Sequence, residues 1–123
     1  MDWEDAQDKI KAYIKVDTDL NTPSSSRRVV ESVASPIYSK RYGYRNESGF
    51  VVPIGQSAKL KIPWSILKKC FSQLNSSEGY SGASFRKQFP LQAKDHPCHV
   101  HVVGRIFVVA GLARADGKKY HAQ

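Results

Sequence analysis

The stretch that decides the fold of the C-terminal half is His99-Val-His-Val-Val-Gly-Arg-Ile-Phe-Val-Val-Ala-Gly-Leu-Ala-Arg-Ala-Asp-Gly-Lys-Lys-Tyr-His121. Its first half is apolar at intervals of three and four residues, which is the spacing of an α-helix. The pattern predicts a helix over residues 98–110. Four side chains should form the face of this helix that packs on the core: Val103, Ile106, Phe107 and Ala110.

Two further signals follow this helix. Gly111 with Leu112 behind it is typical of a Schellman ending, in which glycine takes the left-handed conformation just past the last turn. Asp116-Gly117 is a strong signal for a two-residue turn between antiparallel strands. We therefore expect the helix to lead directly into a hairpin over residues 112–122.

Two helices are expected before this unit. Pro63 suits the first turn of a helix over residues 63–75. The broad apolar face of that helix comprises Trp64, Ile66, Leu67, Cys70, Phe71 and Leu74. A short helix over residues 82–89 should stop at Pro90, and a polar loop should lead from there to the last helix.

The order of helix, short helix, helix and basic hairpin resembles the winged helix-turn-helix superfamily. The resemblance covers residues 62–123 and is strongest in Val-Gly-Arg-Ile-Phe-Val-Val-Ala-Gly-Leu-Ala. It implies that helix 98–110 is a recognition helix and that residues 116–119 are the tip of a wing. This chain departs from the family pattern because most of its β-like sequence precedes the first helix of the unit.

The N-terminal half is mixed. Acids followed by lysines predict an acidic helix within residues 1–20, over residues 2–16, and a loop follows over residues 17–26. Residues 27–33 are a candidate short helix with Ser26 as N-cap. Residues 36–62 are β-rich, with strand-like runs at 37–42, 49–54 and 58–62, and Pro53 favours an edge position for the middle run. We expect a single α+β domain.

The charge is unevenly distributed over the 123 residues, whose formal net charge is +8. Residues 1–20 carry six acids and three lysines, a net −3, and residues 21–123 carry sixteen Lys and Arg against five acids, a net +11. Such asymmetry suggests a basic body that meets a polyanion, although it also serves solubility. The sequence shows neither an apolar run long enough to span a membrane nor a signal peptide, and we expect Cys70 and Cys98 to be thiols of a cytoplasmic protein.

Basic residues in the winged-helix-like unit are the candidate DNA contacts. His101 and Arg105 share a face of helix 98–110, and Arg105 could donate two hydrogen bonds to guanine in the major groove. Contacts with phosphate or the minor groove are expected from the wing residues Lys118, Lys119 and His121, and contacts with the backbone from Arg86 and Lys87; His99 is a further candidate DNA contact. The alternative is that these are ordinary solvated charges on a protein-interaction domain.

A second candidate region contains aromatic and basic residues together: Tyr38, Arg41, Tyr42, Tyr44 and Arg45. Tyrosine and arginine can stack on bases, so Arg41 and Arg45 are candidate DNA contacts. The alternative is a pair of strands whose tyrosines pack across the sheet.

Catalytic and metal signatures are weak. His96-Pro-Cys-His-Val-His101 contains zinc-ligand types, but these donors lie too close in sequence to converge on one ion. The sequence has no Gly-rich phosphate loop and no Ser-His-Asp elbow, and its carboxylates are scattered. We therefore expect no catalytic residue, no metal and no cofactor.

The sequence thus predicts a non-catalytic protein that binds double-stranded DNA. It would act as a small prokaryotic regulator or as the targeting module of a larger system such as restriction, either as a homodimer or with a DNA-processing partner. The alternatives are a winged-helix scaffold for protein assembly and, less favoured, a small metal-dependent enzyme.

Overall fold

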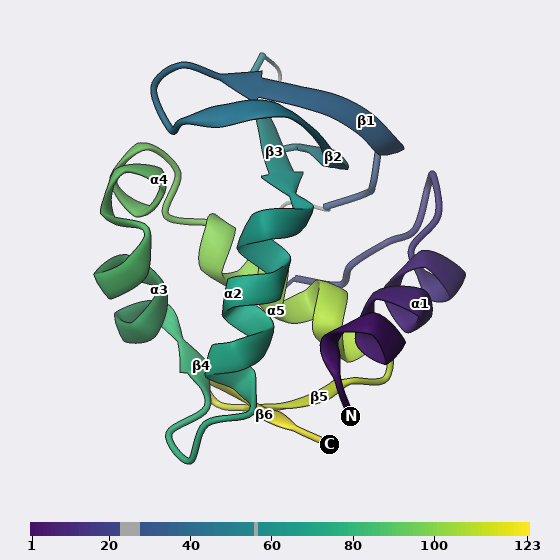
Figure 1. Ribbon diagram of the computed structural model, residues 1–123, viewed down its shortest axis with the longest axis vertical. Coiled ribbons are helices and arrows are strands. Elements are labelled where there is room, and N and C mark those ends of the chain that lie inside the picture. Colours follow the sequence, from purple (N-terminus) through teal and green to yellow (C-terminus); the bar gives the residue numbers. More distant parts are fainter. Residues whose placement is uncertain (23–27, 56) are drawn as a thin grey trace.

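Helices α2 and α5 lie between two small antiparallel sheets in the computed structural model (Figure 1), which describes residues 1–22, 28–55 and 57–123. In Figure 1, α1 lies on one side of these two helices, and α3 and α4 lie on the other side. The elements of the described residues are, in order, α1 (Trp3–Tyr13), β1 (Ser32–Ser39), β2 (Tyr44–Pro53), β3 (Lys59–Pro63), α2 (Trp64–Leu74), β4 (Tyr80–Ser81), α3 (Gly82–Gln88), α4 (Pro90–Asp95), α5 (His99–Val109), β5 (Ala113–Asp116) and β6 (Lys119–Ala122). The expected α+β class is confirmed.

The acidic helix α1 forms as expected but ends earlier, at Tyr13. Asp2 caps it, because its carboxylate accepts a hydrogen bond from the backbone N–H of Asp5 at 2.9 Å. The prediction of a helix over 27–33 is wrong for the described part: Val29 forms an isolated bridge with Asp19, and β1 begins at Ser32. Pairing with β2 outweighs the weak local helix signal here. The proposed N-cap, Ser26, lies outside the described residues.

The first sheet has the order β1-β2-β3. Strand β2 is therefore central, and the prediction that Pro53 marks an edge strand is wrong. The proline is tolerated because it is the last residue of β2, beyond the point where Val51 pairs with Ser32 of β1. Gly49 permits the close approach of the strands: a Cβ there would lie 2.1 Å from the carbonyl oxygen of Ile62.

Two elements of the C-terminal half were not predicted. Tyr80–Ser81 forms strand β4, and Pro90 begins helix α4 instead of starting a loop. Proline fits this place because the first helical residue needs no N–H and the ring fixes φ near its helical value.

The end of α5 forms as predicted. Gly111 has φ of 77°, its N–H donates to the carbonyl of Val108, and the N–H of Leu112 donates to the carbonyl of Phe107 at 2.9 Å, which together make a Schellman ending. The hairpin turn is displaced by one residue. Asp116 pairs with Lys119, so the two loop residues are Gly117 and Lys118.

The second sheet has the order β4-β6-β5, so the last strand in the sequence lies between the other two. Tyr80 pairs with Tyr120 across β4 and β6, and both side chains are buried. The hydroxyl of Tyr80 donates to the carbonyl of Val100 at 2.8 Å, which ties this sheet to α5. Phe107 is fully buried between Phe71 and Tyr80, as predicted.

Candidate nucleic-acid interface

Helix α5, the expected recognition helix, is the central helix of the molecule. All eleven of its residues are buried or half-buried, because α1, α3, α4 and β5 pack around it. Nε of Arg105 donates to the backbone carbonyl of Leu20 at 2.8 Å. The segment that follows α1 therefore covers the face that the sequence suggested for the major groove.

His101 points toward the second sheet. Its Nδ1 is 2.9 Å from the hydroxyl of Tyr120, and burial together with the charge of Lys118 lowers its pKa. Gly104 leaves no room for DNA beside this face, because a Cβ there would lie 2.4 Å from the ring of Tyr120. The structure therefore places His101 and Arg105 in contacts within the protein.

A second histidine of this region, His99, is enclosed. Its side chain is 2% exposed and stacks on Phe85, and its Nδ1 lies 3.2 Å from the carbonyl oxygen of His96. Burial lowers the pKa of His99 to about 4, so the ring is neutral at pH 7. Within the described ranges, no three His, Cys, Asp or Glu side chains are grouped so that they could hold a metal ion.

Exposed cations of the C-terminal unit lie on α2, α3, α4 and the C-terminal hairpin, and four of those on α3 and the hairpin were expected to contact DNA. Arg86, Lys87, Lys118 and Lys119 are exposed, and none of them forms an ion pair within the part of the chain that the structure describes. His121 is half-buried, and its Nε2 is 3.8 Å from the carboxylate of Asp116.

Two of these cations border one pocket, which we call the α3 pocket. It has a volume of about 590 Å³, and its lining includes Gln73, Glu78, Ser84, Lys87, Gln88 and Lys119. The Ser81–Ser84 capping box fixes the start of α3 against β4, and Ser81 pairs with Lys119 of β6. Lys87 of α3 and Lys119 of β6 therefore both border the same depression.

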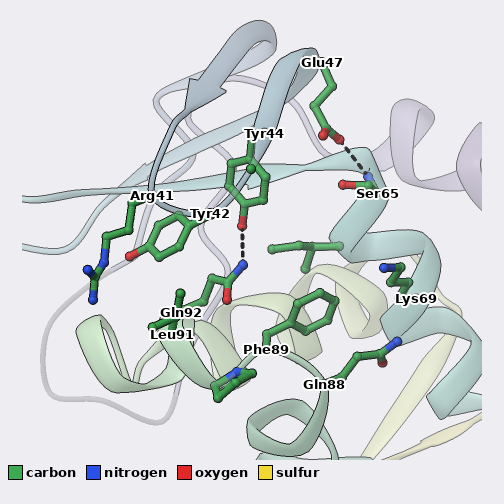
Figure 2. Close-up of a pocket in the computed structure, with 13 residues that line it drawn as sticks. Arg41, Tyr42, Tyr44, Glu47, Ser65, Lys69, Gln88, Phe89, Leu91 and Gln92 are labelled. Carbon is green, nitrogen blue, oxygen red and sulfur yellow. Dashed lines mark hydrogen bonds between the residues drawn. The ribbon is translucent and has the colours of Figure 1, made fainter.

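A second pocket, of about 370 Å³, lies between the β1–β2 turn and the helices α2, α3 and α4; we call it the Tyr42 pocket (Figure 2). One side of it is fixed by Asp95. The carboxylate accepts hydrogen bonds from Arg41 at 2.6 and 3.0 Å and another from the hydroxyl of Tyr42. The hydrogen bond from Arg41, and after it the one from Tyr42, lower the pKa of Asp95 to about 2.

Behind Tyr42, the buried Tyr44 accepts a hydrogen bond from the side-chain amide of Gln92 at 3.0 Å, as Figure 2 shows. Burial raises the pKa of Tyr44 to about 12. On the α2 side, Glu47 accepts a hydrogen bond from the backbone N–H of Ser65, and Nζ of Lys69 lies 5.9 Å from the centre of the Phe89 ring.

The two pockets adjoin at Gln88, which lines both. The amide of Gln73 donates a hydrogen bond to the side-chain oxygen of Gln88 and so holds this shared side chain in place. The two pockets thus follow the seam between α2 and α3.

The tyrosine and arginine region proposed from the sequence is only partly brought together here. Arg41, Tyr42 and Tyr44 line the Tyr42 pocket, whereas Arg45 and the exposed Tyr38 border a different depression on the β1–β2 hairpin. Sequence reasoning missed Glu47, Lys69 and Gln92, because they come from three elements that only the tertiary structure assembles. The one local signal was Lys69, which lies outside the apolar face of α2.

The fold is α+β, with a candidate basic interface on α3 and the C-terminal hairpin. Comparisons with protein-family models, with curated proteins and with solved structures find no match to this chain. Among the described residues, none of the helices combines the length and the apolar character that crossing a membrane requires.

Proposed function

We propose that this protein binds double-stranded DNA without catalysing a reaction on it, through basic side chains of α3 and the C-terminal hairpin. The observation that carries this proposal is the group of four exposed cations without ion-pair partners among the described residues: Arg86, Lys87, Lys118 and Lys119. Two of them border the same pocket. Lysine and arginine in such an arrangement suit the regularly spaced phosphates of a duplex.

The order of elements supports the same proposal. From α2 onward the chain runs helix, strand, two short helices, helix and hairpin, and the last strand pairs with the first strand of this unit. This order is compatible with a winged-helix protein, in which the hairpin is the wing. Because α5 is covered, we propose that α3 and the wing make the contacts, mainly with the DNA backbone.

Backbone contact implies binding with little base preference, as in a targeting module or an accessory subunit of a prokaryotic DNA-processing system. Such a role would place the protein in the cytoplasm. The second candidate is a scaffold for protein assembly, and the covered α5 favours it, since no exposed helix face remains there to read bases.

The proposal is tested by measuring duplex affinity against salt concentration for the wild type and for a Lys118→Ala/Lys119→Ala variant. Each phosphate contact contributes about 0.9 to the slope of log K against log salt, so the double variant should flatten the slope by up to about 2. A Lys9→Ala/Lys15→Ala variant is the matched control, because it removes the same charge from exposed positions on and just after α1. An unchanged slope in the hairpin variant would exclude the hairpin from the interface. Absence of binding at low salt would favour the scaffold.

A further inference from the structure

The Tyr42 pocket has apolar and aromatic walls that are held in place. Tyr42 is fixed by its hydrogen bond to Asp95, and its ring lies 5.5 Å from that of Tyr44. Phe89 and Leu91 also line this pocket. Leu91 is 43% exposed, which makes it one of the few large apolar side chains left open to solvent among the described residues. A flat apolar ligand could lie between these walls.

The polar groups of this pocket include free hydrogen-bond acceptors. Gln92 is only 6% exposed, and its amide nitrogen is used by Tyr44, but its side-chain oxygen accepts no hydrogen bond from any described residue. Glu47 uses one carboxylate oxygen toward the backbone of Ser65, and its other oxygen has no such partner. An amide oxygen and a carboxylate suit the amino and ring N–H groups on the edge of a nucleobase.

The cations lie where a phosphate backbone would pass. Arg41 and Lys69 line the Tyr42 pocket, and Lys87 and Lys119 line the adjoining α3 pocket. Gln88 is common to both pockets, so a nucleic-acid strand that contacts the hairpin would reach Lys69 by following α3. Aromatic walls next to a basic path are typical of sites that hold an unstacked base.

We propose that the Tyr42 pocket receives one unpaired base of a DNA molecule whose backbone follows Lys119, Lys87 and Lys69. This inference rests on the proposed DNA binding and adds the class of DNA: a duplex with a base outside the stack. The volume of about 370 Å³ lies within the range of small-ligand pockets, roughly 300–1,000 Å³. The ring would lie between Tyr42 and Leu91, and Glu47 and Gln92 would accept from its edge.

Three probes test this inference on the full chain: a fully paired duplex, the same duplex with one extrahelical adenine, and deoxyadenosine monophosphate alone. The wild type should bind the duplex with the extra base roughly 5- to 150-fold more tightly than the paired duplex, the range that one stacked base contributes. The nucleotide alone should bind far more weakly, because it lacks the backbone contacts.

The variants are chosen to keep the fold. Leu91→Ala removes an exposed wall residue and should reduce the preference to less than threefold, and Glu47→Gln should also reduce the preference for the duplex with the extra base. Val16→Ala is the control for Leu91, since Val16 is also an exposed aliphatic residue but lines neither pocket. Lys69→Ala tests the proposed path of the DNA backbone through its effect on duplex affinity. Lys68→Ala is its control, because Lys68 is exposed on the same helix outside both pockets.

The outcomes separate the two proposals. Equal binding of both duplexes, with a salt slope that still depends on Lys118 and Lys119, would overturn the base pocket and leave DNA binding intact. No binding of either duplex would overturn both. A nucleotide that binds as tightly as the duplex with the extra base would also overturn the inference, because the site would then serve free nucleotides.

Discussion

Replacing Gly104 with alanine should destabilise this protein, although the same change stabilises most helices. In an ordinary helix interior alanine is favoured over glycine by about 1 kcal/mol. Here the new Cβ would lie 2.4 Å from two carbons of the Tyr120 ring, where ordinary carbon contacts are about 3.5–4.0 Å. The ring must therefore move by about 1 Å.

Tyr120 has little freedom to make this movement. It is 2% exposed, packs against Tyr80 at 5.8 Å and hydrogen-bonds His101. Overpacking of this kind costs about 1–3 kcal/mol, and loss of the hydrogen bond costs about 0.5–1.5 kcal/mol. After the helix preference is subtracted, Gly104→Ala should lower the free energy of unfolding by about 0.5–3.5 kcal/mol.

The assay is urea unfolding followed by circular dichroism. Gly82→Ala is the matched control, because a Cβ there meets only the mobile guanidinium of Arg86, at 2.9 Å. The control should be neutral or slightly stabilising. A Gly104→Ala/Tyr120→Leu double variant should cost less than the sum of its two single changes, since the smaller side chain makes room. A Gly104→Ala variant as stable as the wild type would show that Tyr120 does not cover α5.

Three further predictions concern the same helix. The pKa of His99 is about 4 in the folded protein and about 6.5 in the unfolded chain. Between these pH values unfolding takes up a proton, so the free energy of unfolding should fall as the pH falls from about 6.5 to 4. His99→Phe should flatten this dependence, as measured by urea titrations at pH 7 and 4.5. Arg105→Met removes the hydrogen bond to the Leu20 carbonyl and should speed amide hydrogen exchange in residues 14–22 without changing DNA base preference. A change of base preference at one position would instead show that Arg105 contacts a base. Phe107→Ala should cost about 3–5 kcal/mol, and the half-buried Val108→Ala clearly less; a near-normal thermal midpoint for Phe107→Ala would contradict the observed packing.

Local signals predicted the C-terminal half well. The ending of α5 depends on one glycine and its neighbour, so nearby sequence decides it; Pro63, expected in the first turn of α2, is instead its N-cap and the last residue of β3. Strand β4 has only two residues and exists because β6 pairs with it, so no local pattern could show it. The helix expected over 27–33 failed for the same reason, because strand pairing outweighed a weak local preference.

The placement of α5 was the main error, and the sequence held a signal for it. Seven of the residues from His99 to Val109 are valine, isoleucine or phenylalanine, and they lie on every side of the helix. A helix that is apolar all round is a buried helix. The spacing of the apolar residues predicted one buried face of α5, whereas their number indicated that the opposite face is covered as well. The candidate pockets could not be predicted, because each one joins residues from distant parts of the chain.

The position of β6 between β4 and β5 has a consequence for how the chain folds during synthesis. Strand β4 pairs only with β6 in its sheet, so Tyr80 has no strand partner until Tyr120, forty residues later, has been synthesised. At about 5–20 residues per second, synthesis of these forty residues takes about 2–8 s, whereas a helix forms within about a microsecond. We therefore expect the nascent chain to hold helices α2 to α5 loosely packed, with part of the apolar surface of α5 exposed, until residues 119–122 have emerged from the ribosome. During that interval the protein would be most vulnerable to aggregation and to proteases.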